Sequence, residues 1–197
     1  LDEFDPGTTS EWLDPVFSRL ADELGILLNA IDGKPAPSKL NHTFSVDGQK
    51  ALHAAVSAKL GFNYEQGRID ESEHPFTVGM GPGDIRITTR YFPEDLLEGL
   101  GGTIHETGHG LYEQGLPADW FGPGVGRAAS FGLHESQSRF WENFIGRSLP
   151  FFQWMAPLVK EHCGVEVTAD DLFGAANRVE RSLIRVAADE ATYNLHI

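Results

Sequence analysis

The sequence predicts a mainly α-helical protein that contains one small β-hairpin. Apolar residues recur at intervals of three and four along most of the 197 residues, a spacing that places them on one face of a helix. Residues that commonly start and end helices flank these segments. Residues 76–91 are instead rich in β-prone side chains. We expect the whole chain, 1–197, to form a single domain.

Two helices are expected in the N-terminal third of the chain. The first starts at Thr9-Ser10, which can cap it, and ends at the proline-containing segment 33–37. Its apolar residues are Trp12, Val16, Phe17, Leu20, Leu24, Leu27 and Leu28. The second covers 47–60 and is closed by Gly61, because glycine readily adopts the left-handed conformation that ends many helices.

A hairpin and a third helix are expected in the middle of the chain. The β-prone runs 76–78 and 85–91 are separated by the glycine-rich segment 79–83, which is typical of two strands joined by a turn. A helix then begins after Pro93 and carries apolar residues as far as Tyr112.

Three further helices are expected after residue 120. One covers about 128–145, and a short one lies near 151–161. The last begins at Thr168, where Asp171 completes a pattern resembling a capping box. The residues that follow contain no helix stop signal, so we expect this helix to continue to Ile197.

Charge and composition exclude several classes of partner. The formal net charge of −14 disfavours binding to nucleic acid and to anionic membranes. The sequence contains no run of about 18 apolar residues, so no transmembrane helix is expected. The single cysteine, Cys163, cannot form an intrachain disulfide, which favours a cytoplasmic protein.

The strongest chemical signal is the sequence His105-Glu106-Thr107-Gly108-His109, an HEXXH motif. On a helix, residues four apart lie on one face, so both imidazoles can bind one metal ion, Zn²⁺ above all. Glu106 lies beside that ion and can accept a proton from bound water. The alternative is a surface helix with two ordinary histidines. Glycines at 99, 101 and 102 argue against a solvated helix, since they indicate close approach of another backbone or of a substrate.

A third metal ligand is expected from a later helix. The extended motif with glycine three residues and histidine six residues after the second histidine is excluded, because Tyr112 and Gly115 occupy those positions. Glu135 follows His109 by 26 residues, which suits an antiparallel neighbouring helix. Its neighbours include bulky apolar residues, so we expect that helix to be buried on most sides and its carboxylate to need a cation.

With these residues the sequence resembles the carboxypeptidase Taq family of zinc metallocarboxypeptidases. The resemblance consists of five blocks in order: His74-Pro75-Phe76, Asp84-Ile85-Arg86-Ile87-Thr88, His105-Glu106-Thr107-Gly108-His109, His134-Glu135-Ser136-Gln137 and Ile184-Arg185-Val186-Ala187-Ala188-Asp189. It implies a mainly helical, cytoplasmic and often dimeric enzyme that removes single amino acids from peptide C-termini. Members of the family are usually longer and carry a further G-x-x-Q-D-x-H-W block. This chain therefore resembles the central catalytic region, and we expect a homodimer or self-association.

The resemblance also suggests which residues bind the substrate. A carboxypeptidase must recognise a free carboxylate, and arginine does so with two parallel hydrogen bonds. Arg185 is the first candidate by its place in the family block, with a helical ion pair to Asp189 as the alternative. Arg86 is the second candidate, with pairing to Asp84 or a role in bracing the site as its alternatives.

The sequence therefore predicts a zinc-dependent carboxypeptidase, in which Co²⁺ could replace zinc and a peptide is the substrate. The first rival is a non-catalytic fragment with a structural or empty metal site. The second is another metallopeptidase that uses an HEXXH motif and a glutamate.

Overall fold

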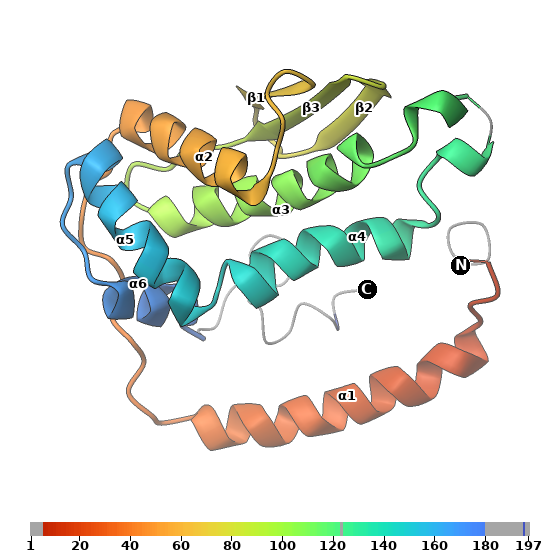
Figure 1. Ribbon diagram of the computed structural model, residues 1–197. Coiled ribbons are helices and arrows are strands. Elements are labelled where there is room, and N and C mark those ends of the chain that lie inside the picture. Colours follow the sequence, from red (N-terminus) through yellow and green to blue (C-terminus); the bar gives the residue numbers. More distant parts are fainter. Residues whose placement is uncertain (1–5, 123, 180–194, 196–197) are drawn as a thin grey trace. The chain divides into compact units, whose positions relative to one another are not determined.

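The structure is a computed structural model that describes residues 6–122, 124–179 and 195. The chain divides into two compact units, of which one is Leu40–Ala176 and the other comprises Leu1–Lys39 and Asn177–Ile197. The expectation of a single domain over the whole chain stays a prediction. The mainly helical class with a small sheet is confirmed (Figure 1).

Helix α1 (Ser10–Ile31) is the described element of the smaller unit, and it begins where the sequence predicts. The Thr9 hydroxyl accepts a hydrogen bond from the Trp12 amide at 3.3 Å, which satisfies one of the free amides at the helix start. Among the described residues, no helix is long and apolar enough to cross a membrane.

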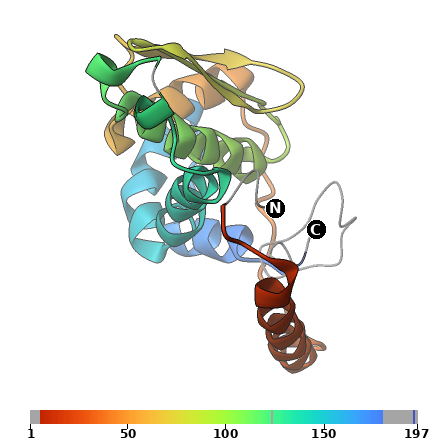
Figure 2. The ribbon, with the colours of Figure 1, turned by 90° about the vertical axis from the view of Figure 1, so that its right-hand side faces the viewer.

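The larger unit is built around helix α3 (Leu96–Gln114). Figures 1 and 2 show a small sheet on one side of α3 and helix α4 (Phe131–Arg139) on the other. Helix α2 (Val46–Leu60) also contacts α3, and it ends at Gly61 in the left-handed conformation, as predicted. The helix that carries the HEXXH motif therefore lies at the centre of this unit.

The sheet contains the predicted hairpin and one further strand. Strands β2 (Thr77–Gly81) and β3 (Asp84–Thr89) pair antiparallel, which confirms the hairpin. Strand β1 (Gly67–Glu71) pairs parallel with β3, so the order is β1-β3-β2. The sequence did not predict β1 because Ile69 is its one large apolar residue, too weak a signal for a strand. Inward-facing Ile85 and Ile87 of β3 pack with Phe62, with Leu111 of α3 against them.

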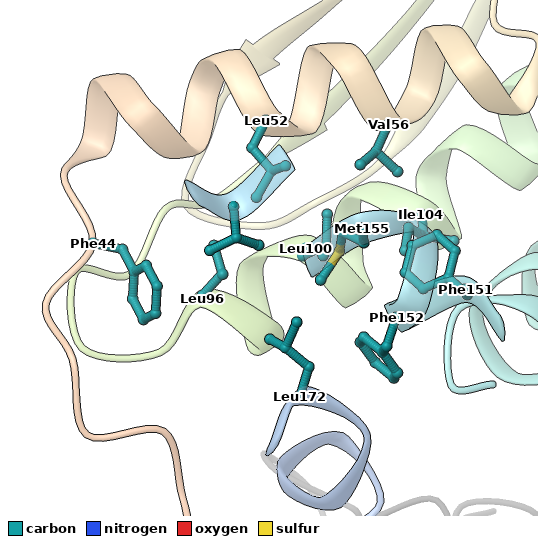
Figure 3. Close-up of a cluster of buried hydrophobic side chains, with 11 residues drawn as sticks. Phe44, Leu52, Val56, Leu96, Leu100, Ile104, Phe151, Phe152, Met155 and Leu172 are labelled. Atoms are coloured by element: carbon teal, nitrogen blue, oxygen red, sulfur yellow. The ribbon is translucent and has the colours of Figure 1, made fainter. Parts of the chain in front are cut away.

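The main core joins four helices of the larger unit (Figure 3). Helices α5 (Leu149–Cys163) and α6 (Ala169–Ala176) contribute to it together with α2 and α3. Its buried side chains are Phe44, Leu52, Val56, Leu96, Leu100, Ile104, Phe151, Phe152, Met155, Val159 and Leu172. Each fully buried side chain of this size contributes about 1.5–3 kcal/mol by leaving water, so this cluster fixes the N-terminal half of α3.

Helix α6 starts as predicted but ends earlier. The Thr168 hydroxyl accepts from the Asp171 amide at 3.1 Å and donates to the Asp171 carboxylate at 2.6 Å, which confirms the cap. The predicted continuation is wrong for residues 177–179, because the helix ends at Ala176. The Arg147 guanidinium donates to the carbonyl of Ala176 and so satisfies an acceptor at that end. The remaining residues predicted for this helix lie outside the described ones, apart from Leu195.

Helix α4 also differs from expectation. It begins at Phe131, where the Ser130 hydroxyl accepts from the Leu133 amide at 3.0 Å, and it continues as a π-helix, η3 (Phe140–Ile145). The prediction that this helix is buried on most sides is wrong, since Phe131 is 73% exposed and Leu133 44% exposed. The helix instead packs against α3 through small residues such as the fully buried Ser138.

Candidate metal centre

Two imidazoles of α3 form one side of the candidate metal centre. His105 and His109 are one helical turn apart, and their ring centroids are 4.9 Å from each other. Their side chains are 19% and 16% exposed, respectively, so they are largely but not fully buried. The predicted helical placement of the HEXXH motif is therefore confirmed.

Glu135 of α4 forms the opposite side. Its Oε2 atom lies 3.2 Å from His109 Nε2 and 3.6 Å from His105 Nε2. One ligand atom from each of the three residues lies within 4.8 Å of the other two. Ligand atoms about 2.0–2.2 Å from a tetrahedral ion are about 3.4 Å apart, so the three side chains fit a single metal ion. Two imidazoles with one carboxylate are a donor set that Zn²⁺ takes in catalytic sites.

Glycine at position 108 lets the two helices approach closely enough for this geometry. A Cβ atom there would lie 2.6 Å from the Ser138 Cα and 2.9 Å from the Gln137 carbonyl oxygen, both of which are backbone atoms of α4. Gly99 allows a similar approach of the Arg90 carbonyl. Among the described residues, the atoms nearest to a Cβ at Gly101 and at Gly102 belong to side chains and lie at 4.0 and 3.7 Å. The predicted close approach is confirmed at Gly99 but not at the other two positions.

Glu106 points away from the main core toward the hairpin. It is 6% exposed, and its Oε2 accepts a hydrogen bond from the Thr77 hydroxyl of β2 at 2.7 Å. The same hydroxyl lies 3.1 Å from the Glu106 carbonyl oxygen. The strand therefore fixes the position of this carboxylate on the helix that carries both histidines.

Each histidine of the cluster has a partner for its second ring nitrogen. His105 Nδ1 lies 2.9 Å from Glu142 Oε2, and the Arg139 guanidinium donates to the same oxygen at 2.8 Å. His109 Nδ1 lies 2.5 Å from Nδ1 of His134. These contacts leave both Nε2 atoms directed toward Glu135. Hydrogen bonds of this kind orient metal-binding histidines and fix which nitrogen carries the proton.

Burial and neighbouring charges shift the pKa values of His105, Glu142 and Glu135 in opposite directions. Burial lowers the pKa of His105. The hydrogen bond and negative charge of Glu142, together with the nearby carboxylates, raise it by more, so the pKa lies above its ordinary value. Burial raises the pKa of Glu142, yet the hydrogen bond from His105 and the charge of Arg139 leave it lowered. For Glu135, burial also raises the pKa, and the hydrogen bond from His109 and the charges of both histidines lower it overall.

Glu142 and His134 were not identified from the sequence. Glu142 follows Glu135 by seven residues, two helical turns, and the same-face spacing could have indicated it. However, Glu142 lies within the π-helix, where the number of residues per turn differs from that of an α-helix. An α-helical projection therefore does not give the direction of its side chain accurately. His134 directly precedes Glu135 on α4, and its ring contacts His109 of α3.

Of the two candidate arginines the structure describes Arg86, which lies outside this cluster. Arg86 is paired with Asp84 through two hydrogen bonds of 2.9 and 2.8 Å, one of the predicted alternatives. Because side chains alternate along a strand and its neighbours Ile85 and Ile87 face α3, Arg86 projects from the other face of the sheet. Arg185 lies outside the described residues. Substrate binding by either arginine stays a prediction.

Comparisons with known proteins agree with the geometry. Residues 1–197 match the family described as carboxypeptidase Taq (M32) metallopeptidase. The chain is 45% identical to thermostable carboxypeptidase 1 of Thermus thermophilus and 39% identical to carboxypeptidase 1 of Bacillus subtilis; each alignment covers the whole chain and 40% of the relative.

Solved structures show the same fold. A crystal structure of an M32 carboxypeptidase from Deinococcus radiodurans R1 has a TM-score of 0.89 and 40% identity, over 99% of this chain and 40% of that one. A structure of Pyrococcus furiosus carboxypeptidase has a TM-score of 0.91 and 34% identity, over 99% of this chain and 41% of that one. The chain thus spans about two fifths of the length of these relatives.

Proposed function

Because this chain belongs to the carboxypeptidase Taq (M32) metallopeptidase family, we propose that it supplies the metal-binding part of a carboxypeptidase. The proposed reaction releases single amino acids from the C-termini of peptides. The observation that supports it most is the convergence of His105, His109 and Glu135, whose ligand atoms lie within 4.8 Å of one another. Both histidines lie on α3, the helix that also carries Glu106. A purely structural metal site would need no carboxylate base beside it.

The proposed ligands are His105 and His109 through Nε2 and Glu135 through its carboxylate. We propose Zn²⁺ as the ion, with Co²⁺ as a substitute, because the donor set is two imidazoles and one carboxylate. When bound, the ion supplies a Lewis acid that polarises the peptide carbonyl and lowers the pKa of a water molecule.

Glu106 is proposed to move the proton in this reaction. Its Oε2 is held by the Thr77 hydroxyl at 2.7 Å, so Oε1 is the oxygen that takes the proton from the attacking water. The same carboxyl group then gives that proton to the nitrogen of the departing amino acid. Burial at 6% exposure keeps bulk water from competing for this carboxylate.

Recognition of the substrate's free C-terminus needs a cation. We propose Arg185 for this role, on the strength of its family block, with Arg86 as the second choice. A peptide amide lacks the negative charge, so it should be a poor substrate. Replacing the correct arginine with alanine should bring the rates for a matched acid and amide closer together.

The direct test is release of C-terminal amino acids by the protein and its Glu106→Gln variant. The variant keeps the shape of the side chain and removes the base, so kcat should fall by about 10²–10⁴-fold with metal content unchanged. Glu98→Gln is the matched control, since Glu98 lies in the first turn of the same helix and should keep normal turnover. Near-normal turnover in the Glu106 variant would exclude Glu106 as the base.

A further inference from the structure

His109 belongs to a line of three side chains that continues beyond the metal cluster. His109 Nδ1 lies 2.5 Å from His134 Nδ1, and His134 Nε2 lies 2.7 Å from Glu113 Oε1. The two rings are tilted by 44° with centroids 4.6 Å apart. The side chains of His134 and Glu113 are 19% and 22% exposed, so both are largely shielded from water.

The chemistry of these atoms decides where the protons lie. An ionised carboxylate can only accept, so the hydrogen bond to Glu113 requires a proton on His134 Nε2. A neutral imidazole carries one proton, and Nδ1 of His134 is then an acceptor. The contact at 2.5 Å is then a hydrogen bond when His109 carries its proton on Nδ1, the tautomer that can bind a metal ion through Nε2. Nε2 of His109 lies 3.2 Å from a Glu135 carboxylate oxygen, to which it can donate a proton when no ion is bound.

We propose that His134 and Glu113 are positioning residues that hold the His109 ring with Nε2 directed at the metal site, where His134 Nδ1 accepts the Nδ1 proton of metal-bound His109. This inference rests on the metal site of the proposed function, but not on peptidase activity. It differs from the arrangement at His105, whose Nδ1 meets the carboxylate of Glu142 directly at 2.9 Å. One metal histidine is thus held by a carboxylate, and the other by a neutral imidazole that a carboxylate polarises.

The surrounding elements hold this line in place. Glu113 lies one helical turn after His109 on the same face of α3, while His134 comes from α4 next to Glu135. Strand β2 lies against the far side of the Glu113 carboxylate, because a Cβ at Gly79 would be 2.7 Å from Glu113 Oε2. The Tyr112 ring packs against His134 with centroids 4.8 Å apart. Helix α4 therefore supplies both a metal ligand and the group that orients another ligand.

A simple structural link between α3 and α4 would produce the same contacts with either arrangement of protons. The tautomers distinguish the two cases. In long-range ¹⁵N–¹H spectra of the zinc-loaded protein, we expect His134 to be neutral with its proton on Nε2, which leaves Nδ1 to accept from His109. A proton on His134 Nδ1 would overturn the proposal. These spectra involve no substrate, so they stand even for a protein without peptidase activity.

Zinc affinity, measured by competition with a chelating dye, is the second readout. His134→Phe removes the acceptor and should weaken zinc binding by about 10–100-fold. His134→Asn places an amide oxygen near the position of Nδ1 and should restore most of that affinity. Ser136→Ala is the matched control on the same helix, because its hydroxyl donates to the Leu133 carbonyl of that helix, at 2.7 Å, and not to the line of His109, His134 and Glu113.

The outcomes are distinct from those of the proposed function. Unchanged zinc affinity in His134→Phe, or equal weakening in the Phe and Asn variants, would overturn the positioning role. If the wild-type protein binds zinc with the expected pattern of variants but cleaves no peptide, the proposed function fails and the positioning role stands.

Discussion

At the scale of single residues, each of the two proposed metal-binding histidines has a hydrogen-bond partner for its Nδ1 atom. Glu142 accepts from His105 and is itself bonded by the Arg139 guanidinium, so removing its carboxylate leaves a ring nitrogen and a cation without this acceptor. We predict that Glu142→Ala weakens zinc binding by about 10–100-fold. Glu142→Gln, whose amide oxygen can still accept, should weaken it less. Equal zinc affinity in the wild-type and Ala proteins, measured by dye competition, would contradict this role.

A second residue-scale prediction concerns the buried His53 of α2. Its side chain is 1% exposed, and its Nδ1 lies 2.8 Å from the Thr103 hydroxyl. Among the described residues its Nε2 has no hydrogen-bond partner, and burial lowers the pKa to about 3. An unfolded histidine has a pKa of about 6.5. Between these two values the unfolded state binds a proton that the folded state does not, so the free energy of unfolding falls as the pH falls.

The expected size of this effect is about 1.4 kcal/mol per pH unit. Between pH 6.5 and 5 it amounts to about 2 kcal/mol, before most carboxylates titrate. The measurement is urea unfolding over this range for the wild-type protein and His53→Asn. The variant should show a shallower decline in the free energy of unfolding with falling pH, whatever its stability at pH 7. An equal dependence of the free energy of unfolding on pH in the two proteins would mean that the pKa of His53 is not lowered in the folded state.

The residues that could be predicted from the sequence are those whose spacing follows the geometry of one helix. His105, Glu106 and His109 are of this kind. Glu135 needed a further assumption about a neighbouring helix, and that assumption held even though the helix is more exposed than expected. His134 acts across two helices, so its contact with His109 depends on the way those helices pack, which local sequence does not encode.

At the scale of elements, the crossing of α3 and α4 decides where Glu135 lies. We predict that Gly108→Ala lowers the free energy of unfolding by about 1–3 kcal/mol, because the new Cβ would lie 2.6 Å from the Ser138 backbone, which must then move. The same movement should displace Glu135 and weaken zinc binding. Thermal unfolding and zinc titration test both effects.

Gly102→Ala is the matched control on the same helix. A Cβ there has only an ordinary contact, 3.7 Å from the Pro75 ring. The better helix propensity of alanine should therefore stabilise the protein by up to about 1 kcal/mol, with zinc binding unchanged. Equal effects of the two substitutions would show that the packing at Gly108 is not tight.

Caps explain which element boundaries could be predicted. Helices α1 and α6 begin at sequence caps that the structure contains, and α2 ends at the predicted glycine. The end of α6 could not be predicted, because it coincides with a hydrogen bond from Arg147, a residue of a distant segment. Strand β1 pairs with β3 but has Ile69 as its one large apolar residue, so its own sequence does not indicate a strand.

At the scale of the whole molecule, large apolar side chains remain exposed on η3, the element that also carries Glu142. Phe140 and Phe144 of η3 are 44% and 76% exposed, and their rings stack with centroids 6.1 Å apart. Exposed apolar patches favour association. We predict concentration-dependent self-association in sedimentation experiments, and expect Phe144→Ser to reduce it several-fold. Phe121→Ser, at an exposed aromatic outside this pair, is the control. A clean monomer at all concentrations would contradict the prediction.

The whole chain carries a formal net charge of −14, and its cytoplasmic location stays a prediction. The acidic surface disfavours nucleic acid as a partner. Burial raises the pKa of the Cys163 thiol above its ordinary value, which favours the protonated thiol near neutral pH.

We propose that one metal ion binds between α3 and α4. Anomalous X-ray diffraction from crystals of the zinc-loaded protein tests this directly. We expect one strong peak about 2.0–2.2 Å from His105 Nε2, His109 Nε2 and a Glu135 carboxylate oxygen. A peak elsewhere, or a peak at the two histidines with the Glu135 oxygens more than about 5 Å away, would contradict it.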